Sequence, residues 1–245
     1  MVSATRTAAR TWVVEWRKLV STPALVLGYA IGIAAAPLTT LIVLNHGASS
    51  GQTTVMHLAM STAAIPVLVF ALCGAYATTV EYESGAIVSS LLVVPHRAAF
   101  YTAKVGAVAL LAAVAAAISW AATIAVVLLA TPAPGPAVGP LWALPVGALV
   151  VGGVAAVGAA AGFVLRGALT TAVALVVALL GPPALGPALG GARRWVIGSG
   201  PAGVIAQAVG ADQSTVGWSV GAAVFSVTVA VVVLIGWRAF ATADH

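Results

Sequence analysis

Charge is scarce in this sequence. Charged residues make up only 6% of the 245-residue chain, whereas 62% of its residues are hydrophobic. A soluble domain with this balance would lack the polar surface that keeps a folded protein in solution. The composition therefore excludes an ordinary soluble domain and predicts one membrane domain.

Cysteine and lysine are also nearly absent. Cys73 is the single cysteine, so no intrachain disulfide can form. The two lysines, Lys18 and Lys104, do not end a phosphate-binding loop of the Gly-Lys-Ser/Thr kind. We therefore expect no nucleotide site of that kind and no cofactor on this chain.

Residues that could carry catalysis or bind a metal are few. No histidine is followed by glutamate, which excludes the His-Glu-x-x-His zinc motif. His46 and His57 share a loop that holds no Asp, Glu or Cys, so we expect no metal site there. The long apolar runs contain none of the ionisable groups that ion-driven transporters place at mid-membrane. We expect no catalytic residue on this chain and no ion-driven transport by it.

Long uncharged runs are what the sequence does have. Residues 24–44 are uncharged, and at about 1.5 Å rise per residue a helix of this length crosses a hydrocarbon layer of roughly 30 Å. Similar runs occupy 58–80, 105–130, 141–165 and 216–237. These runs predict five of six transmembrane helices in an all-α membrane protein.

The remaining span is less regular. An apolar run begins at Ala168 but soon meets Pro182 and Pro183, where we expect the helix to break. We expect the following segment, 189–215, to form short surface or re-entrant helices on the outer side. Six spans over residues 23–245 place both termini on the same side.

Basic residues indicate the orientation. Only Arg193 and Arg194 fall in loops that would be outside when the N-terminus is inside. The other basic residues then lie on the cytoplasmic side: Arg6, Arg10, Arg17, Lys18, Arg97, Lys104, Arg166 and Arg238. We expect both termini in the cytoplasm and the chain in the cell membrane.

Residues 1–22 are predicted to form an amphipathic helix at the membrane surface. A helical wheel collects one apolar face: Ala9, Trp12, Val13, Trp16, Leu19 and Val20. Arg17 and Lys18 lie on the polar face, with Glu15. Tryptophan on one face and basic residues on the other are typical of an interfacial helix. The alternative is a plain positively charged flank of the first span.

The connection 81–104 carries two of the five acidic residues, Glu81 and Glu83. Gly85 permits a bend after the second span, and Pro95 ends any helix between them. That helix has apolar residues on one face: Ile87, Val88, Leu91 and Leu92. We expect it at the cytoplasmic surface, packed on another protein or on its own bundle.

Four pairs of glycines lie four residues apart and fit the small-xxx-small packing pattern: Gly28 and Gly32, Gly158 and Gly162, Gly186 and Gly190, and Gly217 and Gly221. Since the chain has 26 glycines, chance matches are expected, and the pattern carries little weight.

The interfacial helix, the six spans and one loop together resemble a known family. The loop reads Glu81-x-x-x-Gly85, followed by Leu91, Leu92, Pro95, Arg97, Tyr101 and Lys104. This arrangement is similar to the permease subunit of an ATP-binding-cassette transporter of the type-two exporter class. Ala86 departs from the family pattern, which commonly has threonine there, and no basic residue lies between Glu81 and Gly85.

The resemblance implies an exporter driven by a separate ATPase subunit that holds ATP and Mg. The loop would be the coupling helix, with seven residues serving ATPase coupling: Glu81, Glu83, Gly85, Ile87, Leu91, Pro95 and Arg97. A second permease copy, identical or homologous, would complete the transport path. Uncharged spans predict an apolar or amphipathic cargo, such as a drug, lipid or peptide. The competing hypothesis is a non-transporting membrane anchor or assembly subunit.

Overall fold

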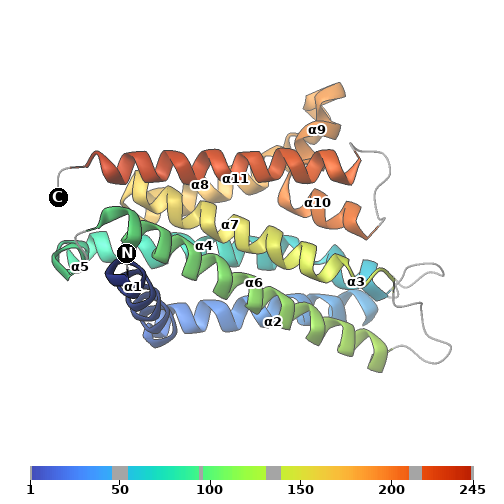
Figure 1. Cartoon of the computed structure of the whole chain (residues 1–245). Helices are drawn as coiled ribbons and strands as arrows, with labels where there is room; N and C mark the ends of the chain where they lie inside the picture. The colour runs from blue at the N-terminus through green and yellow to red at the C-terminus, as the bar shows by residue number, and fades with distance from the viewer. Residues whose placement is uncertain (1, 46–54, 94–95, 131–138, 210–216, 244–245) are drawn as a thin grey trace.

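The computed structural model describes residues 2–45, 55–93, 96–130, 139–209 and 217–243 (Figure 1). Every regular element within these ranges is a helix, as the all-α prediction requires. The order is α1 Val2–Ser21, α2 Pro23–Asn45, α3 Val55–Ser61, α4 Ala64–Glu83, α5 Ala86–Val93, α6 Arg97–Ala130, α7 Ala143–Leu165, α8 Ala168–Ala184, the 3-10 helix η1 Gly186–Ala192, α9 Arg193–Gly198, α10 Pro201–Ala208 and α11 Trp218–Ala241.

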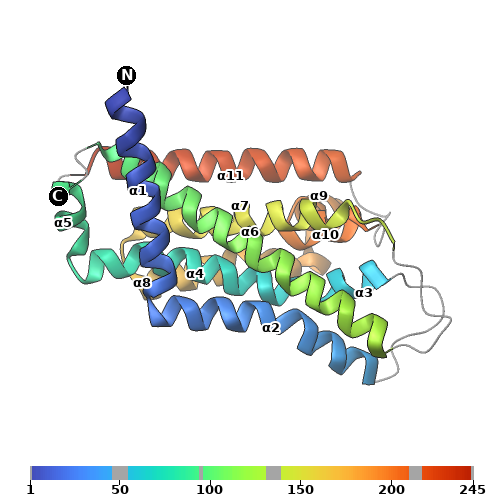
Figure 2. The same cartoon turned by 60° about the horizontal axis from the view of Figure 1, so that its bottom comes forward.

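Five of the described helices are long and apolar enough to cross a membrane: α2, α4, α6, α7 and α11. They run along a common direction and form one bundle (Figures 1 and 2). The chain is therefore a multi-pass, all-α membrane protein. The remaining predicted span, the fifth in chain order, corresponds to α8, whose 17 residues make a helix of about 26 Å, slightly shorter than the hydrocarbon layer.

Two predicted spans have different boundaries in the structure. The run 58–80 is divided, because α3 ends at Ser61 and α4 begins at Ala64. Pro66 explains the division, since it has no N–H to bond the carbonyl of Thr62 and is tolerated only in the first turn of a helix. The helix predicted for 105–130 begins earlier, at Arg97, so that Lys104 lies within α6.

Glycine brings α4 and α7 into backbone contact near the centre of the bundle. A Cβ built on Gly158 of α7 would lie 2.1 Å from the carbonyl oxygen of Ala71, and one on Gly74 of α4 would lie 2.2 Å from that of Ala155. Gly162 is the next glycine along the same face, close to Thr78. The glycine spacing given little weight in the sequence is therefore a packing motif at this crossing.

Helix α8 ends just after the two prolines at which the sequence predicted a break, and not at the prolines themselves. The helix passes through Pro182 and Pro183 and ends at Ala184, and short helices η1, α9 and α10 follow. Among these, α10 is not a surface helix, because Val204 and Ile205 are fully buried and the helix packs on α7 and α11. The last residues of the predicted outer segment, 210–215, lie outside the described residues.

Candidate functional site

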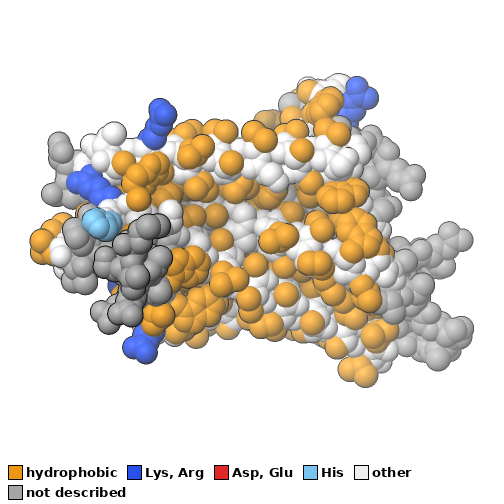
Figure 3. Space-filling model, in the orientation of Figure 1, with side chains coloured by type: hydrophobic (Ala, Val, Ile, Leu, Met, Phe, Trp, Pro, Cys, Tyr) orange, Lys and Arg blue, Asp and Glu red, His pale blue; other side chains and the backbone are white. Residues whose placement is uncertain are grey.

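One end of the bundle collects α1, α5, the end of α4 and the start of α6, and we call it the α5 end. Figure 2 shows α1 crossing the long axes of the other helices there. On the face drawn in Figure 3, apolar side chains cover the flank of the bundle, and most of the visible Lys and Arg side chains lie toward the α5 end. No acidic side chain is visible on that face.

Helix α1 turns part of its polar face inward, contrary to the prediction from the helical wheel. Glu15 is only 1% exposed and Thr11 is also buried, both on the same stripe as the buried Leu19. Of the predicted interfacial residues, Trp16 is half-buried, whereas Arg17 points to the exterior. The wheel assigned Glu15 to water because charge is costly to bury, but it has partners on other helices.

The apolar face of α1 divides between the bundle and the exterior. Val13 and Val20 are about half exposed. Trp12 is partly exposed, and its ring lies over Gly106 of α6, where an added Cβ would come within 2.6 Å of it. This leaves an apolar outer strip on α1, as an interfacial helix requires.

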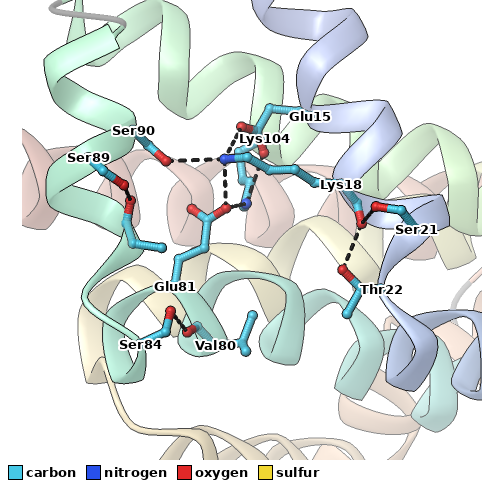
Figure 4. A network of polar contacts seen from close by, with 11 residues as sticks. Glu15, Lys18, Ser21, Thr22, Val80, Glu81, Ser84, Ser89, Ser90 and Lys104 are labelled. Atoms are coloured by element: carbon cyan, nitrogen blue, oxygen red, sulfur yellow. Dashed lines mark hydrogen bonds and ion pairs between the residues drawn. The ribbon is translucent and has the colours of Figure 1, made fainter.

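Four charged residues from three helices form one buried cluster at the α5 end, the four-charge cluster: Glu15 and Lys18 of α1, Glu81 of α4 and Lys104 of α6 (Figure 4). The Lys104 Nζ lies 2.8 Å from Glu15 Oε2 and 2.5 Å from Glu81 Oε1. The Lys18 Nζ lies 3.0 Å from Glu15 Oε1 and 3.0 Å from Glu81 Oε1. Each ammonium therefore bridges both carboxylates, and the four charges sum to zero.

The cluster is largely buried, and a buried site tolerates charged groups only when their charges balance. Glu15 and Lys104 are almost inaccessible, and only the Lys18 side chain, 38% exposed, opens the cluster to solvent. Burial alone lowers the pKa of Lys18, but the neighbouring Glu81 and Glu15 carboxylates outweigh it, so that the pKa lies above its usual value. Lys18 therefore stays charged at neutral pH.

The short helix predicted between Gly85 and Pro95 is present as α5. Gly85, with φ of 69°, makes the bend between α4 and α5 in a backbone conformation that favours glycine. Ile87 is buried and Leu91 packs against the core, so these two predicted coupling residues face their own bundle. Val88 is 49% exposed and Leu92 is 81% exposed, so among the described side chains of α5 these two large apolar residues face outward instead.

Hydrogen bonds join α5 and the neighbouring turn to the rest of the bundle. The Lys18 ammonium donates to Ser90 Oγ of α5 at 3.1 Å (Figure 4). Glu83 Oε1 accepts a hydrogen bond from the backbone N–H of Ala168 at 2.9 Å, at the first turn of α8. Glu81 and Glu83 are therefore both engaged within this chain.

Arg97 is connected to the last helix. Its guanidinium donates to the carbonyl oxygens of Ala241, the last residue of α11, at 2.9 Å and of Ala243, just after the helix, at 2.7 Å. These carbonyls lack partners within the helix, and a cation is favoured at this negative pole. Pro95, the remaining predicted coupling residue, lies outside the described residues.

An aromatic cluster lies beside the charges. The Phe100 ring is 5.9 Å from the ammonium groups of both Lys18 and Lys104, within cation–π range. The same ring contacts Phe163 of α7 and Phe240 of α11. The four-charge cluster is therefore packed directly against the apolar core.

Sequence reasoning missed Glu15, Ser90 and the structural part played by Lys104. A local signal existed for one pair, since Glu15 and Lys18 lie three residues apart on a helix. Nothing local connects them to Glu81 or Lys104, which come much later in the chain. Among the described residues, no group of three or more His, Cys, Asp or Glu could hold a metal ion.

Comparison with known proteins does not assign the chain to a family. No family model matches the sequence, and a search of curated proteins finds no match.

Proposed function

We propose that this chain is the permease subunit of an ATP-driven exporter of the type-two ATP-binding-cassette class. In this proposal α8 is the fifth of six spans, and both termini and the α5 end lie in the cytoplasm. A second permease copy and separate ATPase subunits, which bind ATP and Mg, complete the transporter. The positive-inside distribution of Lys and Arg supports the orientation.

The observation that carries the proposal is the construction of α5. A helix that passes force from a partner must be held firmly on one side and accessible on the other. Ile87 and Leu91 pack inward and Ser90 is bonded to Lys18, while Val88 and Leu92 project outward. Exposed apolar residues at the end of a bundle, beyond the spans, favour a protein contact.

The cargo proposed is apolar or amphipathic. The acidic and basic groups of the four-charge cluster neutralise one another, so they offer no free charge to a charged solute. A charged cargo crossing between the uncharged spans would lose its hydration without gaining partners. Transport by alternating access between two permease copies accommodates drugs, lipids and peptide-like molecules.

Replacing Leu92 with Asp tests the proposal. The variant should insert and remain monodisperse because this side chain is already exposed, but it should lose copurification of the ATPase and cargo-stimulated ATP hydrolysis. The matched control is Leu185→Asp, which alters a leucine that is 59% exposed after α8, away from the α5 end. This control should keep both properties. Full ATPase binding and hydrolysis by Leu92→Asp would favour the passive anchor or assembly subunit.

Thiol labelling tests the orientation separately. On a Cys73→Ala background, cysteines introduced at Ser50 and Pro136 should react with an impermeant reagent in intact cells. A cysteine introduced at Leu92 should react only after the membrane is permeabilised. The reverse pattern would place α5 outside and contradict the proposed exporter.

A further inference from the structure

The four-charge cluster joins elements that are far apart in the sequence. Glu15 and Lys18 come from α1, whereas Glu81 lies in the last turn of α4 and Lys104 belongs to α6. Through the hydrogen bond from Lys18 to Ser90, the same cluster also reaches α5. Helix α1, which lies across the bundle, is thereby bonded to α5.

Positive and negative charges alternate around the cluster, so the stability of each charged group depends on the presence of the others. Each carboxylate contacts both ammonium groups, so removal of Lys104 leaves two carboxylates facing only Lys18. An unbalanced charge is costly in a site where Glu15 and Lys104 are about 2% exposed or less. We therefore expect α1 to be held in place while these charges balance and to be displaced when one of them is removed.

We propose that the four-charge cluster is a latch that holds α1, α4, α5 and α6 together as one rigid body, with Glu15 and Lys104 as its positioning residues. A displacement of α5 is then passed to α1, and hence to the membrane surface on which α1 lies. The transmission step rests on the proposed function, whereas the latching of α1 does not.

Distances between spin labels test the latch on the isolated full chain in lipid nanodiscs. Labels replace the exposed Arg17 on α1 and Leu92 on α5, on a Cys73→Ala background. The parent should give a narrow distance distribution, and Lys104→Met should broaden it at least twofold. The double variant Glu15→Gln/Lys104→Met should narrow it again, because the remaining Lys18 and Glu81 are neutral together.

The double variant separates a charge latch from ordinary packing. If Lys104 acts only by filling space, removing Glu15 as well must leave α1 at least as loose as the single change does, and this result would overturn the proposal. An unchanged distribution in the single variant would overturn it too. Arg194→Gln, which removes an exposed cation of α9, is the control and should leave the distribution unaltered.

Transmission is measured on the complex with its ATPase. Lys104→Met leaves Val88 and Leu92 in place, so the ATPase should copurify while cargo-stimulated hydrolysis falls at least fivefold. The double variant should recover part of this loss. Full hydrolysis with a broadened label distribution would refute transmission and leave the latch standing. If no ATPase binds the parent chain, the proposed function fails, and the label distances still decide the latch.

Discussion

Gly158 of α7 lies directly against the backbone of α4, and its replacement by alanine should separate the two helices. The added Cβ would lie 2.1 Å from the carbonyl oxygen of Ala71 and 3.1 Å from the backbone nitrogen of Ala75. A carbon and an oxygen that are not bonded stay more than about 3 Å apart, so α4 must retreat by roughly 1 Å. No side-chain rotation relieves this clash, because the obstruction is backbone.

The expected cost follows from this geometry. Overpacking a well-packed core costs about 1–3 kcal/mol, and a backbone obstruction belongs at the upper end of that range. The reciprocal contact, in which Gly74 meets the carbonyl oxygen of Ala155, would be loosened by the same retreat. For a chain of this size, about 3 kcal/mol lowers the melting temperature by roughly 6–12 °C.

Thermal unfolding of the purified protein in detergent, followed by the loss of the monodisperse species, measures this effect. The matched control is Gly181→Ala, where the nearest atom to the added Cβ is a Val177 side-chain carbon at 3.9 Å. The control should melt within about 2 °C of the parent, because alanine there meets open space and favours the helix. Equal melting temperatures for Gly158→Ala and the control would refute the close approach of α4 and α7.

Three further predictions concern the α5 end. Glu83→Lys should weaken the start of α8 by about 1 kcal/mol, because it removes the acceptor of the Ala168 N–H and places a cation at a helix N-terminus. Faster hydrogen exchange of the Ala168 amide would reveal this loss. Glu83→Gln, which adds no cation, should show a smaller effect. Arg97→Gln should fray the end of α11, seen as faster tryptic cleavage after Arg238, and an unchanged rate would contradict the cap. The pKa of Lys18 lies above its ordinary value of 10.5, so the stabilisation that its charged form provides is complete below that pH and is lost as pH rises through the folded-state pKa. The α1–α5 label distance should therefore hold from pH 7 to about 10 and broaden only above about 10.5. Broadening between pH 7 and 9 would be inconsistent with a charged Lys18.

Local chemistry made several features of the fold predictable. The long apolar runs require helices in a membrane because backbone groups have no other partners there. Gly85 and Pro95 framed a short helix, and α5 occupies Ala86–Val93. The prolines near the end of α8 predicted its termination. The predicted boundary at residue 58 was wrong because the apolar run continues across a turn that Pro66 requires.

The candidate site was only partly predictable, because hydropathy describes one helix at a time. Ile87, Val88, Leu91 and Leu92 all lie on the apolar face of α5, yet the bundle covers only Ile87 and Leu91. Their exposure depends on how α5 is oriented on neighbouring helices. A pattern within eight residues contains no information on that orientation.

The sequence by itself determined that this is a helical membrane protein. It also determined which segments are helical and where some of them bend or end. These features depend on the length, apolarity and backbone freedom of each segment taken alone. Only the tertiary structure decided which face of α1 points inward, which glycines meet backbone, and that Glu15 and Lys104 lie buried together. The reason is physical: a buried charge is tolerated only where an opposite charge neutralises it. For Lys104, the carboxylates that do so are 89 and 23 residues away along the chain, and folding alone brings them within hydrogen-bonding distance.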